Sequence, residues 1–193
     1  MPQIDRASLM SLETYARERT QFRAKVMAHK KNRSVPLGEH VNLLFEDELT
    51  IRYQVQEMLR VERIFEEQGI QEELDAYNPL VPDGCNLKAT LMLEYPDPEE
   101  RRRKLEELIG IEDKAWVQVQ PHGRVWAIAD EDLDRENEKK TSSVHFLRFD
   151  LSEDMAKALK DGASLTMGID HPRYVAAVEA LPAVRESLVK DLA

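Results

Sequence analysis

The chain contains a single cysteine, Cys85, and this scarcity excludes several classes of protein. One thiol cannot form an internal disulfide, a four-thiolate zinc site or a cysteine-ligated iron–sulfur cluster. Glycine and proline are also few, at seven and nine of 193 residues, and no repeat or low-complexity stretch occurs. Because 42% of the residues are hydrophobic, we expect residues 1–193 to fold as a single domain, despite a charged content of 33%.

Long apolar runs are missing as well. The first residues carry charges throughout, unlike a signal peptide, and no later stretch reaches the ~18 uncharged apolar residues of a membrane helix. We therefore expect a cytoplasmic protein that does not bind a membrane, which agrees with the single thiol.

Positive charge is scarce except at the N-terminus. The net charge is −10, but residues 1–33 hold eight Lys and Arg against three acids, so this segment is +5 and the remainder −15. The overall acidity argues against general nucleic-acid binding. The basic segment is either a solvated helix face that neutralises the acidic body or an arm that meets an acidic partner, a nucleic acid or an anionic ligand.

Motifs that name a reaction are absent too. The sequence has no Walker loop, dinucleotide glycine fingerprint, nucleophile elbow or Cys-x-x-Cys. Nucleotide-dependent and serine-hydrolase chemistry therefore have no positive support, and we expect no bound cofactor.

The pattern of apolar residues predicts an α+β fold. Residues 1–78 are expected to be mainly helical, with helices over 8–31, 47–68 and 71–77 and a short buried strand at 41–45. A turn rich in proline and glycine then leads to a sheet region, 87–171. The predicted strands of this region are 87–95, 115–120, 124–129, 143–151 and 164–170.

Short helices are expected between these strands, with Asp97 and Ser152 as N-caps, and an exposed acidic loop over 130–140. Residues 172–193 are expected to form a C-terminal helical region that Pro182 interrupts. The helical N-terminal part should pack on a mixed, mainly antiparallel sheet with short crossover helices, in an order close to a ferredoxin-like arrangement with an extra strand.

Glu62 is the most informative residue, because it falls within the apolar stripe of the 47–68 helix. At about 100° per residue, one side of that helix carries Ile51, Val55, Met58, Leu59, Val61 and Phe65. A carboxylate among them must be paired, hydrogen-bonded, metal-bound or protonated. The sequence thus predicts a polar core site with the candidate residues Arg19, Tyr53, Gln54, Glu62 and Glu66.

Three roles are open for this site. Glu62 can form a structural pair with Arg19 or with His145, or it can act as a general acid or base with His145 nearby. It can also bind a divalent metal with His145 and His171 if their strands are neighbours, although no His-x-His or Glu-x-x-His spacing supports this. Glu66 either shares a proton or cation with Glu62 or lies at the solvent boundary.

The two tryptophans suggest a surface for a partner. If Pro121-His122-Gly123 is the loop of a hairpin, Trp116 lies opposite Ile128 and Trp126 opposite Gln118. Trp116, Trp126 and Ile128 then share one face, while valines and alanines occupy the other. Both faces of the sheet need cover, from helices of the chain or from another chain, which includes a homodimer.

Several stretches resemble a known bacterial family. They are residues 41–60 (VNLLFEDELTIRYQVQEMLR) with Glu62 and IFEE at 64–67, residues 73–84 (ELDAYNPLVPDG), EYP at 94–96 and SSVHFLRF at 142–149. Together they resemble the family called domain of unknown function 3501, and the likeness extends to about Tyr174. Genes of that family often lie beside those for rubrerythrin-like proteins and an iron–sulfur oxidoreductase. The resemblance implies redox protein partners and a role in oxidative-stress defence, with no catalytic residue to carry over.

Two functions follow from the sequence. The first is a cytoplasmic accessory protein of such a redox module, which binds partners through the face that carries Trp116, Trp126 and Ile128 or through the basic N-terminal helix. The alternative is a small enzyme, or a ligand- or metal-binding protein, with a buried pocket around Glu62.

Overall fold

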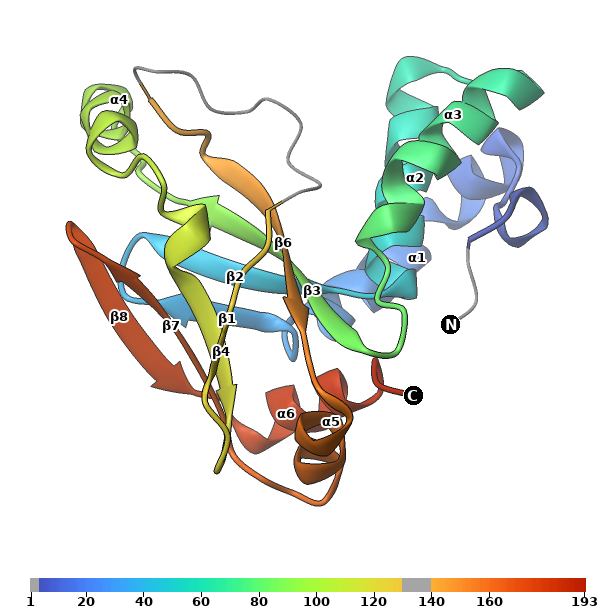
Figure 1. Ribbon diagram of the computed structural model, residues 1–193. Coiled ribbons are helices and arrows are strands. Elements are labelled where there is room, and N and C mark those ends of the chain that lie inside the picture. The colour runs from blue at the N-terminus through green and yellow to red at the C-terminus, as the bar shows by residue number, and fades with distance from the viewer. Residues whose placement is uncertain (1–3, 130–139) are drawn as a thin grey trace.

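Two four-stranded antiparallel sheets enclose the main core of the protein in a computed structural model, which describes residues 4–129 and 140–193 (Figure 1). Sheet A contains, in spatial order, β1 (Ser34–Leu37), β2 (Val41–Glu46), β3 (Asn86–Leu93) and β6 (Val144–Asp150). Sheet B contains β5 (Arg124–Trp126), β4 (Ala115–Val119), β7 (Leu165–His171) and β8 (Tyr174–Glu179).

The edges of the two sheets meet on both sides of this core. After β5 the chain crosses to sheet A, where Ile128 and Arg148 exchange backbone hydrogen bonds of 2.9 and 2.8 Å. At the other edge, the Tyr174 hydroxyl donates to the Leu37 carbonyl at 2.5 Å. Alternate residues of each strand point inward, and the interior they fill is mainly apolar, with the buried His145 among the inward-facing residues. The result is a flattened, nearly closed barrel.

Three helices form a second layer against the outer side of sheet A (Figure 1). They are α1 (Leu12–Lys30), α2 (Glu48–Glu62) and α3 (Glu67–Tyr77), with the short 3-10 helices η1 (Arg6–Ser8) and η2 (Asn78–Leu80) beside them. This layer has its own apolar cluster of Ile4, Leu9, Ile51, Val55, Leu59, Ile70, Leu74 and Leu80. Phe146 of β6 packs against the cluster and so joins the layer to sheet A.

The remaining helices lie near the ends of the sheets. Figure 1 shows α4 (Pro98–Glu107) near one end, and α5 (Glu153–Lys160) and α6 (Pro182–Val189) near the other; η3 (Glu112–Lys114) leads into β4. The predicted N-caps are confirmed: the Asp97 carboxylate accepts from the Glu100 amide at 2.7 Å, and the Ser152 hydroxyl accepts from the Met155 amide at 3.2 Å. The α+β class is confirmed as well. No helix in the described ranges is long and apolar enough to cross a membrane.

The sequence-based account of the elements needs four corrections. The 47–68 helix is two helices, because Arg63 adopts a left-handed conformation that ends α2. Region 172–193 begins with strand β8, and Pro182 starts α6 instead of interrupting a helix. The edge strand β1 was not predicted, because Pro36 within it reads as a break. The strands form two four-stranded sheets in the orders β1-β2-β3-β6 and β5-β4-β7-β8, not one sheet, so the arrangement is not ferredoxin-like. Residues 130–139 of the acidic loop predicted at 130–140 lie outside the described residues.

Gly168 offers a test of the packing in sheet B. A Cβ atom at this position would lie 2.6 Å from Cζ2 of Trp116 and 2.5 Å from the Ala176 carbonyl oxygen. We expect Gly168→Ala to lower the free energy of unfolding by about 1–3 kcal/mol, because the strand and the ring must both move. In Gly123→Ala, the new methyl group meets no atom within 4 Å, so this control should change stability by less than about 0.5 kcal/mol. Urea denaturation of the two variants measures both changes, and equal stabilities would contradict the packing.

Candidate functional site

Glu62 is exposed, so the expectation that it lies in the core is wrong. It is the last residue of α2, and the chain then turns through Arg63 into α3. The apolar stripe of α2 therefore leaves the core before Glu62, and Val61 and Phe65 are 65% and 73% exposed. We call Val61, Ile64 and Phe65 the helical tip. A buried pocket around Glu62 does not form.

Arg19 forms its ion pair with Glu57, not with Glu62. Its Nε and Nη2 atoms donate to the two Glu57 carboxylate oxygens at 2.7 and 2.8 Å, and the Tyr15 hydroxyl donates to the same carboxylate at 2.6 Å. The Arg19 hydrogen bonds outweigh desolvation and lower the pKa of Glu57 from 4.5 to about 2. Burial and the Glu57 hydrogen bond raise the pKa of Tyr15. This cluster ties α1 to α2.

The other residues predicted for a polar core do not converge. Tyr53 is buried, with Phe22 beside its ring and the Lys30 ammonium 5.7 Å from its centroid. Gln54 is half-buried, and Glu66 is exposed at the start of α3, where its side chain makes no capping hydrogen bond. The solvent-boundary interpretation of Glu66 therefore fits the structure.

A polar core does exist, and it is built around Arg33. This side chain is only 1% exposed. Its Nε donates to the Phe45 carbonyl at 2.8 Å and Nη2 to the Glu46 carbonyl at 3.0 Å, while Nη1 reaches the Ser187 carbonyl and hydroxyl, both at 3.3 Å. Nη2 also pairs with the Asp191 carboxylate. One guanidinium therefore joins β2 to α6 and to the turn that follows it.

Two carboxylates share this guanidinium and are held in different states. Asp47 caps α2 through the Thr50 amide at 2.9 Å, and its Oδ2 lies 2.5 Å from Nε2 of His29 and 3.5 Å from Arg33. Burial acts to raise the pKa of Asp47, but Arg33, Thr50 and His29 together lower it. At Asp191 burial prevails over the pull of Arg33 and raises the pKa to about 6. The same guanidinium thus faces two carboxylates whose pKa values are shifted in opposite directions, that of Asp47 downward and that of Asp191 upward.

A hollow of about 250 Å³ adjoins this cluster. It is lined by both carboxylates, by Glu48 and Lys190, and by the apolar residues Leu49, Val81 and Pro82. Glu46 extends the polar cluster toward sheet A, since its carboxylate accepts hydrogen bonds from Thr50 and Thr90 at 2.5 and 2.6 Å. These contacts of Glu46 hold α2 against sheet A.

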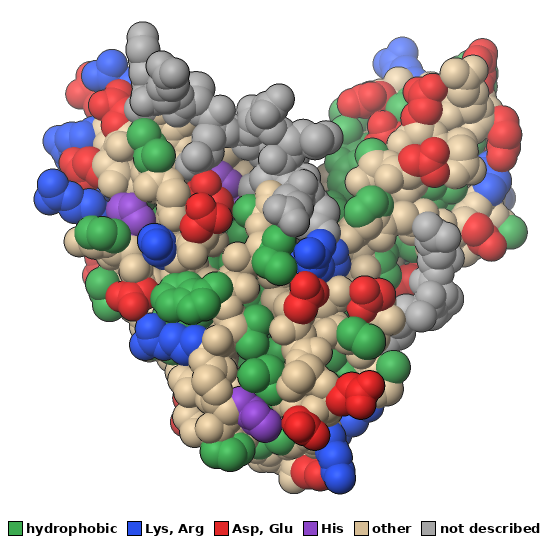
Figure 2. All heavy atoms as spheres, viewed as in Figure 1, with side chains coloured by type: hydrophobic (Ala, Val, Ile, Leu, Met, Phe, Trp, Pro, Cys, Tyr) green, Lys and Arg blue, Asp and Glu red, His purple; other side chains and the backbone are tan. Residues whose placement is uncertain are grey.

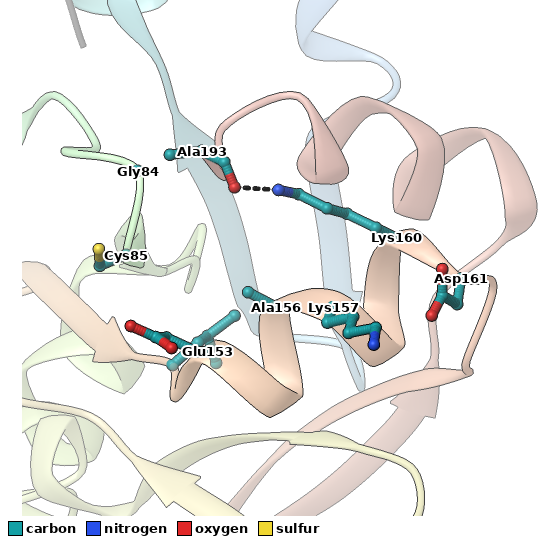
Figure 3. Close-up of a pocket in the computed structure, with 9 residues that line it drawn as sticks. Gly84, Cys85, Glu153, Ala156, Lys157, Lys160, Asp161 and Ala193 are labelled. Carbon is teal, nitrogen blue, oxygen red and sulfur yellow. Dashed lines mark hydrogen bonds between the residues drawn. The ribbon is translucent and has the colours of Figure 1, made fainter.

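A larger hollow of about 430 Å³ lies beside the exposed thiol of Cys85. Figure 3 shows Gly84 and Cys85 on one side and the α5 side chains on the other, with Lys160 reaching the Ala193 carbonyl. Ala193 is also fixed by its amide, which donates to the Gly84 carbonyl at 2.9 Å. The charged side chains around this hollow are Glu153, Lys157, Lys160 and Asp161. The C-terminal turn thus separates the Cys85 hollow from the Arg33 cluster.

The two histidines lie in different sheets, so the predicted convergence with Glu62 is wrong. His145 points inward as predicted and is 1% exposed; its Nε2 lies 2.8 Å from the Thr141 hydroxyl and 3.8 Å from Glu112 Oε2. His171 in β7 approaches the Ile109 carbonyl at 3.1 Å through Nε2. Within 4–129 and 140–193, no group of three or more His, Cys, Asp or Glu residues is arranged to hold a metal ion.

Trp116 and Trp126 do share the outer face of sheet B, with a register that differs from the predicted one. They lie directly opposite each other across β4 and β5, and Gln118 faces Arg124. Ile128 leaves this sheet to pair with β6 and is half-buried, so it does not share a face with the two tryptophans. Trp116 is buried and Trp126 is 44% exposed. Figure 2 shows hydrophobic and basic side chains next to each other on this lobe.

Sequence patterns missed Arg33, Glu57 and Asp191 as members of polar clusters. Arg33 follows α1 in a run of basic residues that reads as solvated, and Asp191 is 158 residues away from it in the chain. Helical spacing offers a signal for Glu57, since it faces α1 from the same side of α2 as Tyr53.

Comparisons with known proteins give a family and a fold. A family model described as protein of unknown function (DUF3501) matches residues 3–192. A crystal structure of a novel protein of unknown function from Burkholderia pseudomallei K96243 matches with a TM-score of 0.95 and 54% sequence identity, over 100% of each chain. The search of curated proteins gave no match.

Removal of the Arg33 guanidinium should destabilise the whole protein. Arg33→Met leaves the buried Asp191 carboxylate and three carbonyls without their donor, so we expect the free energy of unfolding at pH 7 to fall by about 3–5 kcal/mol. Arg33→Met combined with Asp191→Leu should recover part of this loss, because the stranded charge is gone. The exposed Arg17→Met control should stay within about 0.5 kcal/mol. A double variant no more stable than Arg33→Met would contradict the pairing.

Glu57 should make stability depend on acid pH. Its pKa is lower in the folded state than the ordinary 4.5, so its contribution is present above about 4.5 and is lost as the pH falls toward 2. We expect Glu57→Gln to show a smaller loss of stability than the wild type over that interval in urea titrations. The exposed Glu18→Gln should keep the wild-type slope.

Proposed function

Because the chain belongs to the DUF3501 family of proteins of unknown function, we propose its role from its surfaces: it is a cytoplasmic accessory protein that binds a protein partner through the outer face of sheet B. The partner is a redox protein, and the complex serves oxidative-stress defence. We define the tryptophan face as Trp116, Arg124, Trp126, Val175 and Ala177.

The arrangement of Arg124 and the two tryptophans carries the proposal. The Arg124 guanidinium carbon lies 4.0 Å from the ring centroid of Trp116 and 5.9 Å from that of Trp126, and Arg124 also pairs with Asp170 at 3.1 Å. Stacking and the ion pair hold these side chains in place before a partner arrives, which reduces the entropic cost of binding. Tryptophan and arginine are the residues most enriched at binding hot spots.

The rest of the face has the composition of an interface. Val175 on β8 is 73% exposed and Ala177 beside it is exposed, whereas Asp170 and Glu179 provide a polar rim. In Figure 1 the described helices lie near the ends of the sheets or against sheet A, so they leave this face open. An apolar centre with an arginine anchor and an acidic rim fits a protein surface better than a small ligand.

The identity of the partner class is supported by the family resemblance alone. The alternative role, an enzyme or ligand-binding protein with a pocket around Glu62, loses its physical basis because Glu62 is exposed.

Partner capture by matched variants tests the proposal. The tagged full chain is expressed in its native host and compared with Trp126→Ala and Val175→Glu, and bound proteins are identified by mass spectrometry. We expect the captured amount of at least one protein with a metal or flavin centre to fall by about tenfold or more in both variants. Ile109→Ala serves as the control, since Ile109 is 40% exposed at a different site, and it should capture as the wild type does.

Two results would count against the proposal in different ways. If both sheet B variants capture the same proteins as the wild type, the tryptophan face is not the binding surface. If the lost protein contains no redox centre, the binding role stands and the redox assignment fails.

A further inference from the structure

The helical tip exposes apolar side chains that the fold itself does not require. Val61 and Phe65 are 65% and 73% exposed, on a turn whose two helices are already fixed by a closed apolar cluster. A phenylalanine this open to water buries little apolar area within the chain, so it contributes little to the stability of the fold. It is a projecting apolar knob.

A hole lies directly beside this knob. A hollow of about 230 Å³ is bounded by Ile64 and Phe65 on one side and by the start of α1 on the other. Leu59 and Ile70, both buried members of the helical cluster, line it together with the polar residues Arg6, Ser11 and Glu13. A water occupies about 30 Å³ of liquid volume, so this space can hold a large side chain.

A knob and a hole on one patch make that patch complementary to itself. If two copies meet at this patch about a two-fold axis, Phe65 of each copy faces the hollow of the other, and the same contact forms twice. We propose that the helical tip binds a second copy of this chain in a two-fold symmetric dimer, with Phe65 of each copy inserted into the partner copy.

One basic and one acidic side chain flank the knob within a tip that is otherwise acidic, since Glu62, Glu67 and Glu72 are also exposed. Arg63 and Glu66 are both exposed and flank the knob, and both line a second hollow, of about 320 Å³, on its other side. Within the described part of the chain neither side chain has an ion pair. A two-fold axis through the tip sets Arg63 of one copy against Glu66 of the other, so each dimer gains this pair twice.

The backbone at Arg63 supports a role beyond folding. Its φ of 56° lies in the left-handed region. Among the residues that the structure describes, Arg63 is the one non-glycine residue with a positive φ. Glycine is the usual residue at this helix position, and an arginine there costs roughly 1 kcal/mol. The chain therefore carries a strained arginine at the point where a symmetric partner offers a carboxylate.

This dimer would leave the tryptophan faces free. In Figure 1 the turn between α2 and α3 belongs to the helical layer, and β7 and β8 lie at the far side of the molecule. A dimer joined at the tip would thus present two copies of the proposed partner-binding face, which raises avidity for a partner that is itself oligomeric. The dimer does not depend on that proposed function.

Sedimentation of the full chain over a range of concentrations tests the dimer. We expect a reversible monomer–dimer equilibrium for the wild type. The dissociation constant of Phe65→Ser should be at least about thirtyfold higher, because the variant loses the central apolar contact of the interface. Val175→Ser is the matched control, because Val175 is equally exposed, at 73%, on the other lobe, and it should dimerise as the wild type does. Circular dichroism confirms that each variant is folded.

A charge exchange tests the symmetric arrangement. Arg63→Glu should weaken the dimer by about tenfold or more, and the double variant Arg63→Glu with Glu66→Arg should restore it. Arg63→Gly should weaken association while it leaves thermal stability of the monomer unchanged or higher, which a purely structural arginine would not do.

Three outcomes overturn the dimer. They are a wild-type protein that stays monomeric up to about 1 mM, a Phe65→Ser variant that dimerises as the wild type does, and a double charge variant no better than Arg63→Glu.

Discussion

The buried guanidinium of Arg33 is the interaction on which the arrangement of the layers depends. A charge that is 1% exposed is costly to remove from water, and the structure compensates with three backbone carbonyls and two carboxylates. Its partners come from β2, from the N-cap of α2, and from α6 with the turn after it. Because a guanidinium presents its donors in a fixed planar fork, these segments must meet at one place and in one orientation.

The buried polar clusters serve to hold the fold together, whereas other parts of the surface remain available for function. The Arg33, Glu57 and Glu46 clusters hold α1 and α2 to each other and to sheet A, and the interior between the sheets is mainly apolar. Among the described residues, the large apolar side chains left exposed include Trp126 and Val175 on the tryptophan face and Val61 and Phe65 at the helical tip. Exposed apolar patches of this kind are typical of surfaces that bind other chains.

Local signals in the sequence predicted much of the fold. Asp97 and Ser152 cap helices where predicted, because a cap depends on a hydrogen bond to an amide only three residues away. Alternation along β6 placed His145 inward, and the hairpin placed both tryptophans on one face. Glu62 failed because periodicity tells which side of a helix is apolar, not where the helix ends; Arg63 in a left-handed conformation ended it one residue later.

Contacts within a few positions fix the helix N-caps at Asp97 and Ser152 and the alternation along β6, so these features could be predicted from the sequence. Which charges are buried becomes visible only in the folded chain. Arg33 looks like one of several basic residues at the end of α1 until Asp191 and Ser187, which lie 158 and 154 positions away in the chain, close around it. Burial of a charge requires partners from distant segments, and no local pattern records which segments will meet.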